Sequence, residues 1–444
     1  MKSKPRVPPW QGRQFMGHPA GLAVLSLTEM WEMFSFFGMR ALLVYYMTDR
    51  MDFGQQYASL IYGGYAALVY FTPVFGGIIA DRWIGKRNAV LIGGATMALG
   101  HFMMTSEAWF YPALITIALG NGLFLPSLSS QIERLYRKGD PRSKSAYNVY
   151  YVGVNVGALL APLVCGFLGE AFGWHWGFAA AGIGMLVSLV IYVAGTRHLP
   201  PEPGRGDGTR PVRPRLDREG WQRMLFLVGV AAIVVIFRGA YEQVGNTIAL
   251  WAEQGVDRRV TDGFSIPMAW FQALDPLVVI AATPLLVARW SRLAKRGIET
   301  PWLSKMAFGA AIVGLSYLLL AGVAAWASGS GMHAHWGWLV GWFVLMTLGE
   351  LYILPVGLGL FGRMAPDGFR ATSIATWFFA GFFGNLLAGG LGTLWSPLSD
   401  AWFFVIIGGV AGVSAILLYA LSVRVRRTET RDTERDAFAM NPQP

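Results

Sequence analysis

Residues 196–220 read TRHLPPEPGRGDGTRPVRPRLDREG, a stretch rich in proline, glycine and arginine. A segment of this composition has no apolar face to bury, so we expect a linker here and no packed helix. On both sides of it, mostly apolar runs of about 20 residues, the length that spans a bilayer as a helix, recur along the chain. The sequence therefore predicts an all-α membrane protein whose two halves are joined by this linker.

The apolar runs predict twelve membrane-spanning helices, six in each half. In the first half they cover residues 20–47, 58–80, 87–105, 109–130, 146–168 and 175–195. In the second half they cover residues 221–252, 264–289, 302–326, 336–361, 371–394 and 401–423. The predicted organisation is a cytoplasmic N-terminus (1–19), a six-helix bundle (20–195), the cytoplasmic linker (196–220), a second six-helix bundle (221–423) and a cytoplasmic tail (424–444).

Composition supports the membrane assignment and excludes several other classes. Hydrophobic residues make up 54% of the 444 residues and charged residues 14%, whereas soluble domains carry about 25% charged residues. The single cysteine, Cys165, excludes an internal disulfide framework. Histidine and cysteine spacings match no metal site, and no nucleophile constellation or ATP site is present. We therefore predict a protein that is not an enzyme and that binds no metal or cofactor.

The net charge of +10 is explained by the loops between helices. Lys and Arg form short clusters after alternate predicted helices, as expected for cytoplasmic loops under the positive-inside rule. This pattern favours a multi-pass membrane protein with both termini cytoplasmic, and it argues against a nucleic-acid partner. Arg258 and Arg259 are an exception to it. The clusters contain Arg82, Lys86, Arg87, Arg134, Arg137, Lys138, Arg142, Lys144, Arg289, Arg292, Lys295, Arg296, Arg424, Arg426 and Arg427.

The loop after the second predicted helix carries a motif. Residues 77–87 read GIIADRWIGKR, which resembles the loop signature of the major facilitator superfamily, whose members join two six-helix bundles and bind substrate between them. Gly85 permits a tight turn, and the carboxylate of Asp81 can pair with basic side chains nearby. An ordinary basic loop is the alternative. The residues assigned to this conformational loop are Asp81, Arg82, Gly85, Lys86 and Arg87.

The first predicted helix carries charges that a bilayer disfavours. Residues 29–40 read EMWEMFSFFGMR, and helical periodicity places Glu29 and Arg40 on one face with Glu32 at its edge. A charged side chain at the bilayer centre costs about 2.5–3.5 kcal/mol on insertion scales. We therefore expect these groups to face a polar interior, the alternative being a purely structural ion pair.

This helix resembles the motif Glu-x-x-Glu-Arg-Phe-x-Tyr-Tyr-Gly of the proton-dependent oligopeptide transporter (POT) family, within the major facilitator superfamily. Further matches follow in the family's order. They are residues 120–126 (GNGLFLP), 150–158 (YYVGVNVGA), 237–243 (FRGAYEQ), 271–276 (FQALDP) and 349–355 (GELYILP). The resemblance implies alternating-access symport of protons with di- and tripeptides. Together with the chain length, it also implies that the protein lies in a bacterial inner membrane.

The resemblance also implies roles for particular residues. Arg40 matches the arginine that helps to hold the peptide carboxylate, and Glu242 matches a glutamate of proton coupling and gating. Asp275 and Glu350 match positions near the peptide amino group, and Tyr70 and Asn155 match pocket residues. Glu242, Phe37 and Trp377 complete the substrate-binding prediction. For proton coupling, the predicted residues are Glu29, Glu32, Glu242 and Arg238.

The chain departs from the family pattern where coupling chemistry is expected. The helix-1 arginine, the two motif tyrosines, the helix-4 lysine, the helix-7 tryptophan, the helix-8 asparagine and the helix-10 serine are replaced by Met33, Phe36, Phe37, Leu125, Arg238, Asp275 and Leu354. The linker is also too short and polar for the two extra helices common in bacterial members. As a result, five predicted site acids face only two arginines, Arg40 and Arg238, a net charge of −3.

This charge balance leaves three hypotheses open. The first is proton-coupled symport of di- or tripeptides or peptide-like compounds. The second is a transporter of a non-peptide, amine-bearing or cationic metabolite with altered or absent proton coupling. The third, a non-transporting membrane sensor, conflicts with the cost of keeping buried charges. Arg238 lies one turn before Glu242, so the two can also form a purely structural pair. The expected partners are a small solute, protons and lipid, and we expect a monomer.

Overall fold

The computed structural model describes residues 14–137, 139–202, 216–298 and 300–440. Lys138, residues 203–215 of the predicted linker, and residues 1–13 and 441–444 of the predicted terminal segments lie outside these ranges. The described chain is almost entirely helical, as predicted.

The first half contains a bundle in which α2 packs against α7 and α9, and α5 packs against α3 and α4. Its helices are α2 (Ala20–Tyr45, continued by the π-helical η1, Tyr46–Arg50), α3 (Gln55–Ile79, continued by η2, Ala80–Ile84), α4 (Lys86–Met103), η3 (Glu107–Trp109), α5 (Phe110–Ser129), α6 (Gln131–Arg134), α7 (Arg142–Ala161), η4 (Pro162–Gly166), α8 (Phe167–Phe172), α9 (Trp174–Gly195) and η5 (Thr196–His198).

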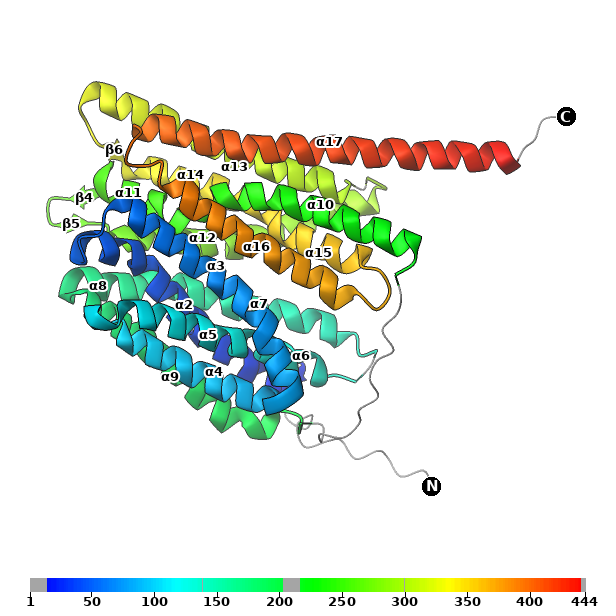
Figure 1. Cartoon of the computed structure of the whole chain (residues 1–444), viewed down its shortest axis with the longest axis horizontal. Coiled ribbons are helices and arrows are strands. Elements are labelled where there is room, and N and C mark those ends of the chain that lie inside the picture. The colour runs from blue at the N-terminus through cyan, green and yellow to red at the C-terminus, as the bar shows by residue number, and fades with distance from the viewer. Residues whose placement is uncertain (1–13, 138, 203–215, 299, 441–444) are drawn as a thin grey trace.

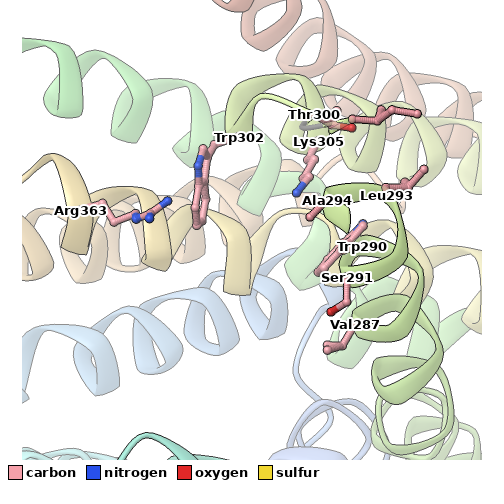
Figure 2. Close-up of a pocket in the computed structure, with 10 residues that line it drawn as sticks. Val287, Trp290, Ser291, Leu293, Ala294, Thr300, Trp302, Lys305 and Arg363 are labelled. Atoms are coloured by element: carbon pink, nitrogen blue, oxygen red, sulfur yellow. The ribbon is translucent and has the colours of Figure 1, made fainter. Parts of the chain in front are cut away.

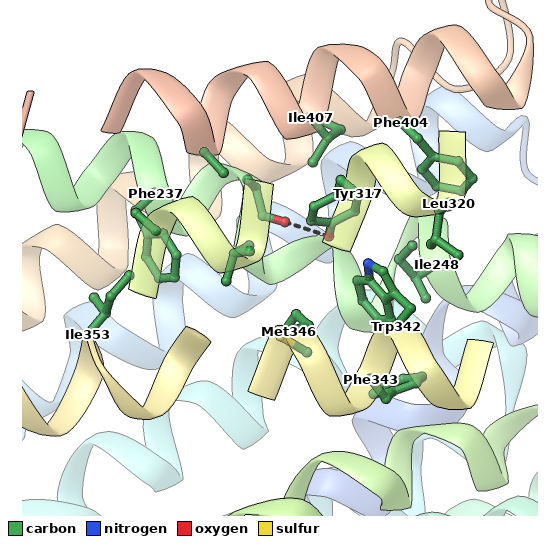
Figure 3. Close-up of a cluster of buried hydrophobic side chains, with 14 of the residues drawn as sticks. Phe237, Ile248, Tyr317, Leu320, Trp342, Phe343, Met346, Ile353, Phe404 and Ile407 are labelled. Atoms are coloured by element: carbon green, nitrogen blue, oxygen red, sulfur yellow. Dashed lines mark hydrogen bonds between the residues drawn. The ribbon is translucent and has the colours of Figure 1, made fainter. Parts of the chain in front are cut away.

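The second half contains the other bundle, in which α13 packs against α14 and α17, and α10 packs against α16 and α17. Its helices are α10 (Arg218–Tyr241), η6 (Glu242–Gly245), α11 (Thr247–Gln254), η7 (Met268–Ala273), α12 (Leu274–Lys295), α13 (Trp302–Ser330), α14 (Trp336–Leu351), α15 (Leu354–Met364), α16 (Arg370–Gly392) and α17 (Asp400–Met440). Figure 3 shows its core, where the hydroxyl of the buried Tyr317 donates to the carbonyl of Ala240 at 2.8 Å and the Tyr317 ring packs against Trp342 and Phe404.

Ten helical segments of the described ranges are long and apolar enough to cross a membrane. The α2 and α4 helices are outside this set. The charges Glu29, Glu32 and Arg40 interrupt α2, and α4 opens on the basic pair Lys86 and Arg87. Both helices nevertheless pack inside the first bundle, so the predicted order of helices is retained.

Some predicted helix bounds were wrong, for local reasons. The helix predicted from residue 264 begins only at η7, because Phe264–Ser265 forms β5 in a hairpin with β4 (Arg259–Thr261). The pair Asp262-Gly263 between them is a strong hairpin signal. The helix predicted over 336–361 is interrupted before α15, where Pro355 lacks an amide hydrogen for helical bonding. The last helix continues beyond residue 423 to Met440.

Four other short strands complete the fold. An antiparallel pair forms from β1 (Gln14–Phe15) and β2 (His18–Pro19). A parallel pair joins β3 (Val256–Asp257) to β6 (Ala334–His335). Alternation of apolar and polar residues is too brief in two-residue strands to be recognised in a sequence.

The two halves are joined at one end of the bundle. Figure 1 shows α11, β4, β5 and β6 at this end, and α6 together with the start of α10 at the opposite, linker end. We call the first the closed end. Hydrogen bonds between the halves there run from Tyr45 to the carbonyl of Ala249 (2.9 Å), from Gln55 to the carbonyl of Gly392 (2.9 Å), from Ser59 to Asn246 (2.9 Å), and from the amides of Met268 and Ala269 to Glu170 (3.1 Å each).

Close packing at the closed end depends on Gly63 of α3. A Cβ atom at this position would lie 2.5 Å from the Cα of Gly389 in α16, so Gly63→Ala should push the two halves apart at a cost of about 1–3 kcal/mol. We expect a lower melting temperature for this variant in detergent. The adjacent Gly64 has open space around it, and Gly64→Ala is the matched control. Equal melting temperatures for both variants would contradict this packing.

Candidate functional site

A buried ion cluster joins the two halves of the chain. Arg40 on α2 donates to one oxygen of Glu242 at 2.6 Å, and Arg238 on α10 donates to the other oxygen at 2.8 Å. The side chain of Glu242 is 2% exposed, and those of Arg238 and Arg40 are 6% and 16% exposed. One carboxylate is therefore shared by two guanidinium groups, one from each bundle.

The position of Glu242 follows from the local sequence. Arg238 and Glu242 are four residues apart, so the helical repeat places both on one face of the chain. The α-helix then ends, and Glu242–Gly245 forms a 3₁₀ turn before α11 begins at Thr247. Discontinuous membrane helices are typical of transporter binding sites, because irregular backbone at membrane depth must be buried in protein or line a cavity.

Two tyrosines of α3 hold the arginines in place. The Nε of Arg40 donates to the Tyr62 hydroxyl at 2.6 Å, and Arg238 donates to the Tyr70 hydroxyl at 3.1 Å. The guanidinium of Arg238 also lies 4.9 Å from the centre of the Tyr70 ring, a cation–π distance. Arg238 of the second half is thus bonded to a tyrosine of the first, which makes the cluster a contact between both bundles.

The second half contributes an acid pair beside this cluster. Asp275, in the first turn of α12, accepts a hydrogen bond from Thr347 at 2.6 Å. The carboxyl groups of Asp275 and Glu350 are in hydrogen-bonding contact, and Tyr241 adjoins Glu350. Tyr151 of α7, which is 44% exposed, faces the same two acids from the first half. The structure therefore brings two of the predicted amine-binding residues together.

The acids of the first helix lie deeper in the first half. Glu29 is 2% exposed and Glu32 is fully buried. Within the described ranges, neither oxygen of Glu32 has a hydrogen-bond partner, and Tyr150 adjoins Glu29. Tyr65 lies near both Glu32 and Arg40, and its buried hydroxyl has no hydrogen-bond partner among the described residues.

The remaining predicted pocket residues differ in their surroundings. The Phe37 ring lies 6.0 Å from the Arg40 guanidinium. Asn155 donates to the carbonyl of Tyr151 in its own helix, next to the acid pair. Trp377 is 5% exposed and packs edge-to-face on Phe361 in the core of the second half, away from the described contacts of the ion cluster. The contacts of the arginines instead include Tyr62, which carries no charge or motif that singles it out in the sequence.

The predicted conformational loop contacts the chain that follows the first bundle. Gly85 has a φ of +80°, which favours glycine, and Lys86 lies 3.7 Å from Asp81, while Arg82 is exposed. Arg87 donates to the carbonyls of Leu199 and Pro200 at 3.0 and 2.8 Å, and its backbone amide donates to Glu202 at 2.6 Å. The loop is thus tied to residues 199–202, where the linker begins.

Comparison with known proteins places this arrangement in context. A family model described as the POT family matches residues 87–216 and 213–401. The peptide transporter YePEPT of Yersinia enterocolitica subsp. palearctica is 32% identical, with 86% of this chain and 89% of the relative covered. A di-/tripeptide transporter of Lactococcus lactis subsp. cremoris is 28% identical, with coverage of 91% and 95%.

Solved structures agree with this match. A crystal structure of a peptide transporter POT in complex with sulfate has a TM-score of 0.85 and 30% identity, and covers 95% of this chain and 97% of its own. A POT family transporter in complex with 5-aminolevulinic acid has a TM-score of 0.81 and 25% identity, with coverage of 94% and 98%. The shared fold is that of the major facilitator superfamily.

Proposed function

The chain belongs to the POT family, and from this premise we propose that it is a secondary transporter that moves di- or tripeptides, or peptide-like compounds, together with protons. The observation that carries the proposal is the ion cluster in which Glu242 is shared by Arg40 and Arg238. A buried charge cluster that joins two bundles can be formed and broken as the bundles move. Its state is therefore coupled to the direction in which the transporter opens.

In this mechanism the two ends of a zwitterionic substrate bind to opposite charges. Arg40 binds the substrate carboxylate, because its guanidinium can form bidentate hydrogen bonds with a carboxylate. The acid pair Asp275 and Glu350 binds the amino group. Tyr70, Asn155, Phe37 and Trp377 are proposed as further substrate-site residues, of which Trp377 acts through the packing of the second half.

Proton coupling is assigned to Glu242. When a proton adds to its carboxylate, the negative charge that holds both arginines is lost, and Arg40 becomes free to bind the substrate carboxylate. When the proton leaves towards the opposite side of the membrane, Glu242 forms its ion pair with Arg40 again and the substrate is released. Arg238 stays beside Tyr70 and keeps Glu242 in position, and Glu29 and Glu32 are further proton-binding groups.

The described structure corresponds to one state of an alternating-access cycle. The hydrogen bonds between the halves at the closed end exclude solute from that side. Under the positive-inside rule, the linker end carries the basic loops and faces the cytoplasm. We therefore assign the structure to an inward-facing state of a monomeric inner-membrane protein with both termini cytoplasmic. The conformation of the loop from Asp81 to Arg87 depends on the position of the bundles.

A second candidate function is transport of an amine-bearing metabolite that is not a peptide. The presence of Asp275 supports it, because this acid gives the amine subsite two carboxyl groups that can hold one strongly cationic group. Met33 and Leu125 supply no positive charge near Glu29 and Glu32, which also leaves the acids in excess. Such a transporter would depend less on the pH gradient.

Uptake by proteoliposomes separates these functions. Labelled dipeptide and a set of small amines are offered with and without an imposed pH gradient, acidic outside. We expect dipeptide uptake that increases with the gradient. Amine uptake that is indifferent to the gradient, with no dipeptide uptake, would instead identify the second function, and no uptake of either class would favour a non-transporting protein.

A further inference from the structure

A pocket of about 350 Å³ lies outside the site between the halves. Figure 2 shows it between the last turns of α12, the first turns of α13 and the end of α15. Its lining comes only from the second half, and none of the residues proposed above for substrate or protons takes part. Any ligand of this pocket is therefore independent of the transported solute.

Two cations and two tryptophans give the pocket its chemistry. The Nζ of Lys305 lies 4.9 Å from the centre of the Trp290 ring, and the guanidinium of Arg363 lies 5.4 Å from that of Trp302. In Figure 2 the Lys305 amine points towards Trp290 and the Arg363 guanidinium towards Trp302. Among the described residues, neither cation has a carboxylate within ion-pair distance.

The start of α13 adds hydrogen-bond donors. Pro301 precedes the helix and offers no side-chain cap, and Trp302 is its first residue. The first amides of a long helix have no intrahelical acceptors and carry a partial positive charge. Since Thr300 and Trp302 line the pocket, the start of α13 adds partial positive charge to a pocket that already contains two cations, which favours an anion.

The pocket also has the location and the apolar surface that a lipid requires. It lies at the helix ends of the linker end, where tryptophans and basic residues meet the headgroups of a bilayer. Val287, which is 51% exposed, and Leu293 line the pocket on the α12 side. An acyl chain can follow these side chains towards the membrane interior. Basic pockets between membrane helices on the cytoplasmic side are known to bind lipid headgroups.

We propose that Lys305, Arg363 and the tryptophans beside them bind the phosphodiester group of an anionic phospholipid. Exposed Arg289 on α12 and exposed Arg296, which directly follows this helix, add positive surface charge nearby without lining the pocket. A lipid held there links α12, which carries Asp275, to α13 and α15, and so stabilises the second half as a unit.

Native mass spectrometry of the full-length protein in detergent tests this proposal. Phosphatidylglycerol and phosphatidylcholine are added at equal concentration, and bound lipid is counted. We expect one phosphatidylglycerol to be retained in preference to phosphatidylcholine. The double variant Lys305→Gln/Arg363→Gln should lower phosphatidylglycerol binding by about tenfold or more, because each basic residue near the headgroups contributes about 1 kcal/mol, roughly fivefold.

The control variant Arg289→Gln/Arg296→Gln likewise removes two positive charges from the linker end of the second half, but it spares the residues that line the pocket. We expect it to retain phosphatidylglycerol. Equal loss in both double variants would overturn the proposal in favour of general surface attraction. Displacement of the lipid by millimolar inorganic phosphate would also overturn it, because the site would then bind free phosphate. Unchanged melting temperatures in lipid-free detergent show that the variants are folded.

Discussion

Glu242→Gln should abolish uptake of dipeptide driven by a pH gradient while exchange of labelled for unlabelled dipeptide across the membrane persists. Glutamine carries no charge and cannot take up a proton, so the arginines on both sides of it remain permanently released. Substrate can still bind to Arg40, and the bundles can still move with substrate bound. Proteoliposomes measured in both modes give the two rates, and we expect the gradient-driven rate to fall to that of protein-free liposomes.

Glu170→Gln is the matched control for this variant. Glu170 is another acid that joins the halves, but its partners lie at the closed end: the backbone amides of Met268 and Ala269 at 3.1 Å, and Arg258 at 3.8 Å. We expect dipeptide uptake by Glu170→Gln to depend on the pH gradient as it does in the wild type. If Glu242→Gln kept both rates, Glu242 would not be the coupling residue.

Arg40→Gln should lower the affinity for dipeptide by about 30-fold or more. Loss of one partner of a buried, hydrogen-bonded charge pair costs about 2–5 kcal/mol, and Arg40 is the proposed partner of the substrate carboxylate. The wild type should prefer a dipeptide to its C-terminal amide, and the variant should show no such preference. Competition of both compounds against labelled dipeptide measures this difference.

The control for Arg40→Gln is Arg50→Gln, which removes an exposed arginine that pairs with exposed Glu107 at 2.8 Å. It should bind dipeptide like the wild type. A variant at Arg40 that still distinguishes the acid from the amide would show that another group, such as Arg238, holds the carboxylate.

The fold was largely predictable because hydrophobicity dominates the sequence of a membrane protein. The apolar runs gave the helices in order, and charges in α2 marked it as facing a polar interior. The breaks after Glu242 and before Leu354 were not predicted, because a helix interruption at membrane depth depends on partners from other helices. The hairpin of β4 and β5 was not predicted, although the pair Asp262-Gly263 is a hairpin signal. The apolar run that follows this pair favoured a helix instead.

The candidate site was predictable where spacing along one helix determines contact. The pairing of Arg238 with Glu242 follows from their four-residue separation and is present in the structure. Contacts between helices do not follow from spacing. Tyr62 and Thr347 were missed because uncharged residues with hydroxyl groups are common, and only the packing of α3 and α14 shows that they hold Arg40 and Asp275.

The departures from the family pattern acquire a physical meaning in the structure. With Met33 and Leu125 in place of basic residues, the described contacts of Glu29 and Glu32 contain no cation. Arg238 instead places a second positive charge in the other half, on Glu242. We propose that charge compensation has moved from the first bundle to the contact between bundles, and that Glu242 has become the principal coupling group.

Reactivity of a single introduced cysteine tests most directly whether the ion cluster faces a water-filled substrate path. The native Cys165 is buried, so Phe37→Cys, beside Arg40, can be labelled with little background. We predict that a charged thiol reagent, added from the side of the linker end, labels this cysteine and that dipeptide protects it, whereas Phe34→Cys in the buried core of the first half is unreactive. A Phe37→Cys variant that stays unlabelled, or that dipeptide does not protect, would contradict the proposed path.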